Sequence, residues 1–408
     1  MAVQAKNWLI WICAVLLGAA LGAPARAESA ADSFPVIRDA RIAGDSKITR
    51  FVLDLDRRID LNAFALANPY RLVIDLPQVT FQLAPKTGEN GRGLIKVFRY
   101  GLVMTGGSRI VMDLTGPAKI DKAYVLDASA DAPARLIVEL SATSRAAFLQ
   151  SLTVPARPSR APAAAPSPAA EGDARPVVVL DPGHGGIDTG TQGSHGETEK
   201  MMVLDFALAL KDHLDKAGKY RVVMTRADDT FISLAERVRM ARAANAALFI
   251  SIHADALPRG EGDVQGASVY TLSDRASDAE AERLAEAENR ADLIAGIDLS
   301  EEPSEVADIL IDLAQRETRT FSSRFAKILV HEMKGVARMH KKPVKSAGFR
   351  VLRAPDVPSV LVELGYVSNK ENLQDLMSNQ WRMRTVASVA QAVDGFFASR
   401  LAASGAAK

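Results

Sequence analysis

Val177-Val178-Val179-Leu180-Asp181-Pro182-Gly183-His184-Gly185-Gly186 is the stretch that decides the fold of the C-terminal half. It begins with four apolar residues, three of them β-branched. A short apolar run of this kind is typical of a strand that is buried on both faces. The glycines on both sides of His184 predict a tight loop directly after that strand. A buried strand followed by such a loop indicates an α/β domain with a parallel sheet.

Strands and helices alternate along the chain after this stretch. The expected elements are a helix over 197–217, a strand over 220–225, a helix over 234–244, a strand over 247–253, and strands over 269–272 and 360–363. The first helix carries apolar residues that we expect to share its buried face, namely Met201, Leu204, Leu208 and Leu214. This order predicts a mostly parallel, twisted sheet flanked by helices, in a domain that spans residues 176–403. Ligands of such folds bind at the carboxyl ends of the strands.

A different pattern occupies the N-terminal part of the chain, from residue 34 to residue 145. Short runs of alternating apolar and polar residues are separated there by turn residues, and hardly any helical periodicity is present. The expected strands cover 48–55, 70–76, 93–100, 108–114, 120–126 and 134–140. Asn90-Gly91 and Gly106-Gly107 are the expected hairpin turns. Many short strands at regular spacing predict an all-β sandwich domain.

The segment 151–175 joins these two expected domains. It contains Pro155, Pro158, Pro162, Pro166 and Pro168 among alanines and serines, and almost nothing in it can build a core. A composition of this kind is typical of a semi-extended linker between bodies that can move relative to each other.

The first 27 residues resemble a cleavable signal peptide. Lys6 is followed by an apolar run from Trp8 to Leu21, and Ala25-Arg26-Ala27 fits the small-x-small cleavage pattern. The alternatives are a membrane anchor or a buried helix, but the run is shorter than the roughly 20 residues that span a bilayer. We therefore expect export to the periplasm and a mature chain with no stable transmembrane segment.

Cysteine and charge content narrow the chemistry further. The single cysteine, Cys13, lies in the expected signal peptide, so a metal site in the mature chain must use His, Asp and Glu side chains. Lys and Arg number 50 against 49 Asp and Glu, which leaves a formal charge of +1. This balance argues against a nucleic-acid partner, because such proteins carry a clustered basic surface.

Polar residues stand at the ends of three expected strands. His184 follows the first strand, His253 ends the strand over 247–253, and Glu363 ends the strand over 360–363. Glu199 starts the first helix, a short loop beyond His184. Two imidazoles and one carboxylate are a common ligand set for catalytic zinc, which keeps one position open for water. Zinc lowers the pKa of that water towards about 7, and a nearby carboxylate can then take its proton.

Four short motifs together resemble the zinc-dependent N-acetylmuramoyl-L-alanine amidases, a family that includes the cell-division amidases. They are Asp181-Pro182-Gly183-His184-Gly185-Gly186, Glu199-Lys200, Ser251-Ile252-His253-Ala254-Asp255 and Val362-Glu363-Leu364-Gly365. The resemblance covers about residues 176–401. By strand pattern and position, the N-terminal β domain is similar to the AMIN domain that precedes the catalytic domain in Gram-negative division amidases.

The resemblance implies a zinc ion (Zn2+) held by His184, Glu199 and His253, with Glu363 as the catalytic carboxylate. It implies hydrolysis of the amide between the lactyl group of N-acetylmuramic acid and the L-alanine of the peptidoglycan stem peptide. Peptidoglycan is then the substrate, and cell-wall remodelling and daughter-cell separation are the expected roles. Glu197 is the alternative to Glu199; two helical steps turn a side chain by about 200°, so only one of them can face the metal.

Two further acidic residues are candidates for a resting state of the site. Asp255 is a candidate fourth ligand, with orientation of His253 or capping of a turn as the alternatives. The segments 274–297 and 304–336 are both expected to be helical, the second with a core-facing stripe. The first segment resembles the autoinhibitory helix of the division amidases. That helix places a glutamate on the zinc until a LytM-domain activator pulls it away. Glu280 is the expected plug.

Two other functions fit the same residues. One is a zinc peptidase that shortens the stem peptides of muropeptides. The other is a catalytically silent protein that binds or regulates peptidoglycan, although the presence of every expected ligand and of Glu363 argues against it. Binding of peptidoglycan by the N-terminal domain is supported by fold analogy alone, and a purely structural role is its alternative.

Overall fold

The computed structural model describes residues 34–104, 106–130, 132–152, 173, 175–193, 196–256, 265–297 and 309–405. The expected signal peptide and most of the expected linker lie outside these residues. Among the helices that are described, none is both long and apolar enough to cross a membrane. The expected fold class is confirmed, with an all-β region followed by an α/β domain.

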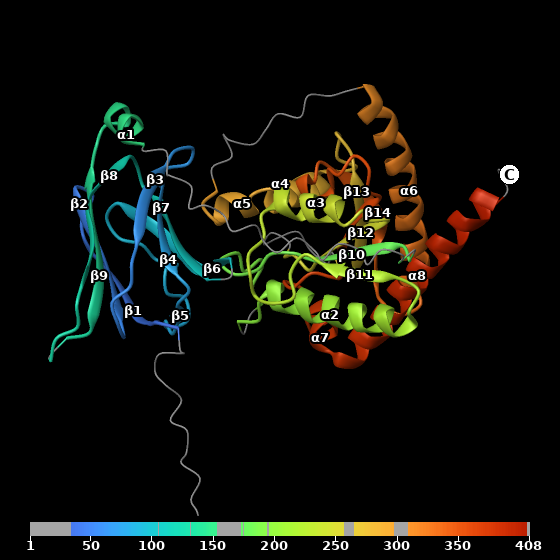
Figure 1. Ribbon diagram of the computed structural model, residues 1–408, viewed down its shortest axis with the longest axis horizontal. Coiled ribbons are helices and arrows are strands. Elements are labelled where there is room, and N and C mark those ends of the chain that lie inside the picture. The colour runs from blue at the N-terminus through green and yellow to red at the C-terminus, as the bar shows by residue number, and fades with distance from the viewer. Residues whose placement is uncertain are drawn as a thin grey trace, which may run out of the picture. The chain divides into compact units, whose positions relative to one another are not determined.

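The N-terminal region consists of two β-sheets and one short helix (Figure 1). Its elements are β1 (Val36–Gly44), β2 (Ile48–Leu55), β3 (Asn62–Leu66), β4 (Arg71–Pro77), β5 (Thr80–Phe81), β6 (Ile95–Met104), β7 (Gly107–Leu114), β8 (Ala118–Leu126), β9 (Ala134–Ala142) and α1 (Arg145–Ser151). One sheet has the order β5-β1-β2-β9-β8 and the other β3-β4-β7-β6. Neighbouring strands are antiparallel except β1 and β5.

Alternation along the strands builds the core between the two sheets. In β2, Phe51, Leu53 and Leu55 are fully buried, whereas the residues between them point away from the core. Phe51 meets Phe98 of the other sheet edge to face, with ring centroids 5.1 Å apart. The hairpin expected at Gly106-Gly107 joins β6 to β7. The one expected at Asn90-Gly91 is absent, because this pair lies in the connection between β5 and β6, which belong to different sheets.

The C-terminal region is built on a six-stranded sheet. Its elements are β10 (Val177–Pro182), α2 (Glu199–Ala217), β11 (Arg221–Met224), α3 (Leu234–Ala243), β12 (Leu248–His253), β13 (Ala267–Leu272), α4 (Ala279–Glu288), α5 (Ala291–Ile294), α6 (Ile309–Met333), β14 (Met339–Ala347), a 3-10 helix (Arg350–Leu352), β15 (Ser359–Glu363), α7 (Lys370–Met377) and α8 (Asn379–Gly405). The strand order is β11-β10-β12-β15-β13-β14. All neighbours are parallel except β13 and β15, so the sheet is mixed.

Helices cover both faces of this sheet (Figure 1). On one face α2, α6, α7 and α8 pack on alternate strand residues such as Val178, Ile250 and Val362. On the other face α3, α4 and α5 pack on the intervening residues, such as Val179 and Leu361. Every residue of β10, β12 and β15 is buried, as the apolar runs predict for strands covered on both faces.

Two expected helices differ from the structure. The buried stripe of α2 runs through Glu199, Val203, Phe206, Leu210 and Leu214. The expected face was wrong in part, since Met201 and Leu208 of that set are exposed. The segment 274–297 forms two short helices, α4 and α5, rather than one.

Candidate active site

A strained glycine-rich loop presents His184 beyond the end of β10. His184 adopts a positive φ of 59°, as do Gly185 and Gly186 after it, with φ of 126° and 56°. Gly183 is required for space, because a Cβ atom there would lie 2.3 Å from Cε1 of His253. The loop therefore brings the imidazole of His184 close to that of His253, with ring centroids 4.9 Å apart.

A buried ion pair beneath this loop fixes its backbone. Nη1 of Arg237 lies 2.7 Å from Oδ1 of Asp181, and the two side chains are 3% and 0% exposed. The same guanidinium donates to the carbonyl of Pro182 at 2.8 Å and to that of His184 at 2.6 Å. Burial alone would raise the pKa of Asp181, but Arg237 and the hydroxyl of Thr225 outweigh it, and the pKa is lowered. Asp181 is thus ionised, and Arg237 can hold the carbonyls of the loop in place.

Asp188 orients the imidazole of His184. Its Oδ2 lies 2.9 Å from Nδ1 of His184, and both side chains are buried. A neutral imidazole that donates from Nδ1 to this carboxylate presents the lone pair of Nε2 to the interior of the site.

Glu199 enters the site as the first residue of α2 and is fully buried. Its Oε1 accepts a hydrogen bond from the backbone N–H of Ala254 at 2.8 Å, and its Oε2 accepts one from that of Thr191 at 3.0 Å. These two bonds fix the carboxylate between the loop after β10 and the end of β12. The buried stripe of α2 selects Glu199 over Glu197, which precedes the helix.

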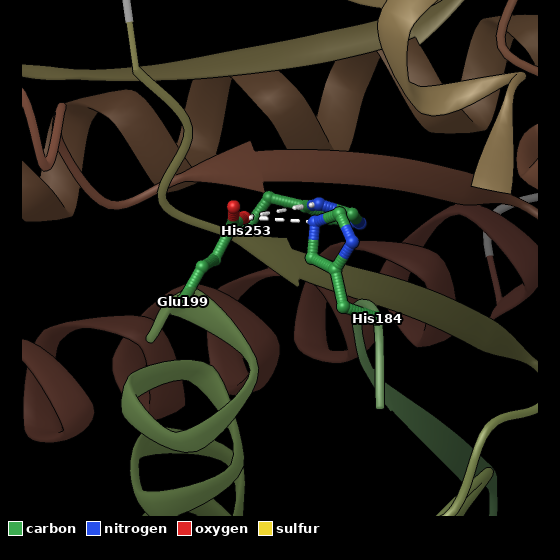
Figure 2. A group of neighbouring side chains, drawn as sticks. All are labelled: His184, Glu199 and His253. Carbon is green, nitrogen blue, oxygen red and sulfur yellow. Dashed lines mark ion pairs between the residues drawn. The ribbon is translucent and has the colours of Figure 1, made fainter. Parts of the chain in front are cut away.

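His184, Glu199 and His253 converge in the structure. One ligand atom from each of the three residues lies within 4.8 Å of the other two (Figure 2). Oε1 of Glu199 is 3.1 Å from Nε2 of His184 and 3.4 Å from Nδ1 of His253. Both of these nitrogens are buried and have no hydrogen-bond partner among the described residues. Two imidazole nitrogens and a carboxylate oxygen in this arrangement could hold a divalent metal ion.

The charges within this cluster depend strongly on one another. Burial alone would lower the pKa of His184, but the carboxylates of Glu199 and Asp188 outweigh it and raise that pKa well above its usual range. Burial alone would raise the pKa of Glu199, whereas His184 and His253 lower it well below its usual range. The site therefore favours a positive charge at His184 beside the ionised carboxylate of Glu199.

Glu363 lies beside His253, because β12 and β15 are parallel and pair these two residues directly. Its side chain is fully buried, and Oε2 accepts a hydrogen bond from the backbone N–H of Asp255 at 3.0 Å. Oε1 is buried without a hydrogen-bond partner in the described part of the chain. Burial, together with the charges of Glu199 and Asp255, raises the pKa of Glu363 well above its usual range. A carboxyl group with an unpaired oxygen and a raised pKa takes up a proton more readily than an ordinary glutamate does.

Asp255 does not reach the cluster as a ligand. Its Oδ1 accepts a hydrogen bond from the hydroxyl of Thr191 at 2.6 Å and another from the backbone N–H of Ala256 at 2.6 Å. Its carboxylate is therefore engaged with the loops around the site, and the group of converging ligand atoms does not include it.

Glu280 also lies away from the cluster, contrary to expectation. Its Oε1 accepts a hydrogen bond from the hydroxyl of Tyr366 at 2.8 Å, and its Oε2 lies 2.7 Å from Nζ of the buried Lys345. The acidic residue of α4 that reaches the cluster is Glu288, whose Oε2 lies 3.1 Å from Nδ1 of His253 and 3.7 Å from Nε2 of His184. Burial, together with the charges of Glu199 and Asp255, raises the pKa of Glu288 to about 7.

The periodicity of α4 contains the signal that identifies Glu288. The buried residues of this helix are Ala281, Leu284, Ala285 and Glu288. They follow the spacing i, i+3, i+4 and i+7 of one helical face. Glu288 is the acidic residue on that apolar face. Glu280 directly precedes Ala281, the first residue of the face, and is not part of it. Arg237, which was also missed from sequence, carries no comparable signal, because its partners Asp181, Pro182 and His184 lie more than 50 residues earlier in the chain. Asp188 was missed although it follows His184 by only four residues, because an irregular loop has no periodicity that marks a residue facing the site.

Imidazoles and buried carboxylates that meet at the carboxyl edge of an α/β sheet define an enzyme with its active site at that edge. The sequence profile of N-acetylmuramoyl-L-alanine amidases matches residues 178–395, and that of AMIN domains matches residues 39–140. The chain belongs to the N-acetylmuramoyl-L-alanine amidase family.

Individual relatives agree with this assignment. N-acetylmuramoyl-L-alanine amidase AmiC of Escherichia coli O6:H1 is 33% identical over 373 residues, which cover 88% of this chain and 88% of the relative. AmiC of Neisseria meningitidis serogroup B is 32% identical over 380 residues, which cover 89% of this chain and 90% of the relative. AmiA of Escherichia coli K12 is 40% identical over 222 residues, which cover 54% of this chain and 76% of the relative.

Proposed function

We propose that the protein hydrolyses the amide between the lactyl group of N-acetylmuramic acid and the L-alanine of the peptidoglycan stem peptide, with zinc as its metal. Membership of the amidase family supports the reaction. The observation that carries the metal is the convergence of ligand atoms from His184, Glu199 and His253 within 4.8 Å.

The residues of this cluster fit a zinc ion. Two imidazoles and one carboxylate are a ligand set that zinc prefers at catalytic sites. Nε2 of His184 and Nδ1 of His253 are buried nitrogens without a hydrogen-bond partner among the described residues. Burial of an unpaired polar atom is energetically costly, and a bound metal ion would remove that cost. Asp188 holds the other nitrogen of His184, as a carboxylate outside the ligand set does in many zinc sites. Bound zinc would supply Lewis-acid polarisation of the amide carbonyl and a lowered pKa of water at the open position.

Glu363 would move the proton in this reaction. Its free Oε1 can accept a proton from the attacking water and deliver it to the nitrogen of the leaving L-alanine. The N–H of Asp255 holds Oε2, so the carboxyl group keeps one orientation throughout. The raised pKa suits this role, because the basicity of a carboxylate increases with its pKa.

The segment that carries α4 and α5 would regulate the site. Glu288 lies 3.1 Å from Nδ1 of His253, so its carboxylate stands where substrate would have to approach the metal ligands. We propose that this segment keeps the enzyme inactive and that a LytM-domain activator displaces it. Glu288 replaces Glu280 as the residue in this role.

The domain plan and the location remain part of the proposal. A signal peptide over residues 1–27 would export the chain to the periplasm, where its peptidoglycan substrate lies. An AMIN domain over residues 34–145 and a linker over residues 151–175 would precede the catalytic domain over residues 176–403. Cell-wall remodelling and separation of daughter cells are the roles that follow.

Digestion of purified sacculi tests the proposed reaction. Wild-type protein and Glu363→Ala are incubated with the same sacculi, and the released fragments are identified by mass spectrometry. We expect free stem peptides that begin with L-alanine from the wild type and almost none from the variant. Shortened stem peptides would indicate a peptidase instead, and equal cleavage by both proteins would refute the role of Glu363. A silent, wall-binding protein would release nothing and would contain no stoichiometric zinc.

A further inference from the structure

The four-stranded sheet of the AMIN domain has an apolar patch on the face that points away from its own core. In β4 and β7, neighbouring residues alternate between the two faces of the sheet. Leu72 and Ile74 belong to the core of the sandwich, so Val73 between them points outward. Val111 of β7 is the cross-strand partner of Val73, and both valines are completely buried. Something other than the AMIN core must therefore cover them.

The catalytic domain covers this face. Residues Pro35–Lys408 form one compact unit, and Val73 and Val111 share a hydrophobic cluster with Ala295 and Ile187 of the catalytic domain. Gly296, with a φ of 71°, lies directly on the valines. A Cβ atom at Gly296 would be 2.9 Å from a methyl carbon of Val111 and 3.0 Å from one of Val73. The chain that leaves α5 thus runs against the sheet with no room for a side chain.

Two arginines of the same sheet bind the backbone of this segment. Nη1 of Arg71 donates to the carbonyl of Leu293 at 2.9 Å, and Nη1 of Arg109 donates to the carbonyl of Ala295 at 3.0 Å. Both carbonyls lie at the C-terminal end of α5, where a positive charge is favourable. Arg109 is also held by Asp75 through two hydrogen bonds, so its guanidinium is fixed before the segment docks.

The docked segment is continuous with the residue that reaches the metal-site cluster. Glu288 ends α4, and α5 begins three residues later. Within the catalytic domain, Asn289 binds the backbone of Gly348 and Arg350, and Asp292 accepts a hydrogen bond from the N–H of Leu234. The AMIN sheet holds the residues that follow. Movement of α4 and α5 away from the cluster as one segment would therefore break contacts with both surfaces.

We propose that the outer face of the sheet β3-β4-β7-β6 is an intramolecular docking surface that holds residues 291–297 and thereby keeps Glu288 at the metal-site cluster. The AMIN domain is then a latch on the active site in addition to any targeting role. This inference rests on the proposed function for one point only, namely that Glu288 at the cluster blocks activity. It follows that a ligand which draws the AMIN sheet away from α5 favours the open site.

Substitutions confined to the AMIN domain test the latch without touching the packing inside the catalytic domain. Val111→Glu places a carboxylate in the covered apolar patch, which opens the contact because a buried unpaired charge is very unfavourable. Arg71→Met keeps the apolar stem but removes the donor to Leu293, and provides a milder second variant should Val111→Glu fail to fold. Val52→Glu is the matched control, since Val52 points outward from β2 in the other sheet and is not part of this cluster.

Hydrogen–deuterium exchange over residues 279–297 in the purified protein is the direct readout. We expect exchange at least about tenfold faster in Val111→Glu, a smaller increase in Arg71→Met, and no change in Val52→Glu. Circular dichroism of each variant checks that the AMIN sandwich is folded. Unchanged exchange in a folded Val111→Glu protein, or in Arg71→Met if the former does not fold, overturns the latch.

Basal release of stem peptides from sacculi, measured on the same variants, separates the latch from the proposed function. Faster exchange with raised activity supports both. Faster exchange without raised activity supports the latch and counts against occlusion by Glu288. The variant Glu288→Ala provides an independent check, because it removes the occluding carboxylate and leaves the AMIN contact intact.

Discussion

Removal of the carboxylate of Asp188 should weaken zinc binding without removing a ligand. Asp188 accepts a hydrogen bond from Nδ1 of His184 at 2.9 Å, and both side chains are almost completely buried, at 3% and 7% exposed. A buried hydrogen bond to a charged group contributes about 1.5–3 kcal/mol. Because 1.4 kcal/mol corresponds to a tenfold change in an equilibrium constant, Asp188→Ala should weaken zinc binding by about 10- to 100-fold.

Competition with a chromophoric chelator at fixed pH measures the zinc dissociation constant of each variant. Asp188→Asn is the matched control, since its amide oxygen can still accept the hydrogen bond from His184 although the charge is gone. We expect the order wild type, Asp188→Asn, Asp188→Ala from tightest to weakest. An unchanged dissociation constant for a folded Asp188→Ala protein would refute the idea that this carboxylate fixes the imidazole for the metal.

Three further predictions follow from other contacts. Arg237→Met should lower the free energy of unfolding by about 3–5 kcal/mol, because the buried carboxylate of Asp181 then lacks a compensating charge. Urea denaturation followed by circular dichroism measures this free energy, and a loss below about 1 kcal/mol would contradict the prediction. The pKa of Asp181 is lowered in the folded protein, so its ionised form stabilises the fold above its unfolded pKa of about 4, and that contribution is lost as the pH falls through the folded pKa. The difference in stability between wild type and Asp181→Asn should therefore shrink below about pH 4, and a difference that stays constant with pH would count against this assignment. Glu288→Ala should raise basal activity on sacculi, and Glu280→Ala, the control, should not produce that increase. Equal basal rates of wild type and Glu288→Ala would show that the site is open in the resting protein.

The sequence predicts the ends of the central strands well, and with them most of the site. Each of β10, β12 and β15 contains a short apolar run that marks its position in the sequence. His253 and Glu363 are the last residues of β12 and β15. Parallel strands bring their carboxyl ends to one edge of the sheet, so the strand pattern by itself places these two residues together although they are far apart along the chain.

Helix faces were harder to predict from the same information. Met201 and Leu208 are apolar yet exposed, because the stripe of α2 that packs on the sheet begins at the polar residue Glu199. An acidic residue on an apolar face breaks the simple alternation of apolar and polar positions. Glu288 is likewise an acidic residue on a buried face, that of α4, and its polarity makes it look exposed. The spacing of Ala281 and Leu284 is the signal that places it on the buried face.

Side-chain contacts that do not follow from the pairing of neighbouring strands could not be predicted from the sequence. Arg237 meets Asp181 because α3 packs beside the end of β10, and no spacing in the chain encodes that distance. The outward-facing Val73 and Val111 were indistinguishable from ordinary strand residues, since only the docking of Ala295 shows why both faces of those strands are apolar. Such contacts depend on the packing of whole elements rather than on local sequence.

Zinc content measured by plasma mass spectrometry tests the central claim most directly. Protein purified without added metal is compared with His253→Ala and with Thr385→Ala, a control at a buried helical position outside the site. We predict one zinc ion per chain in the wild type and the control, and a large loss of zinc in His253→Ala. A folded wild-type protein that binds no zinc even after metal is supplied, or a His253→Ala protein that retains it fully, would contradict a metal centre built on His184, Glu199 and His253.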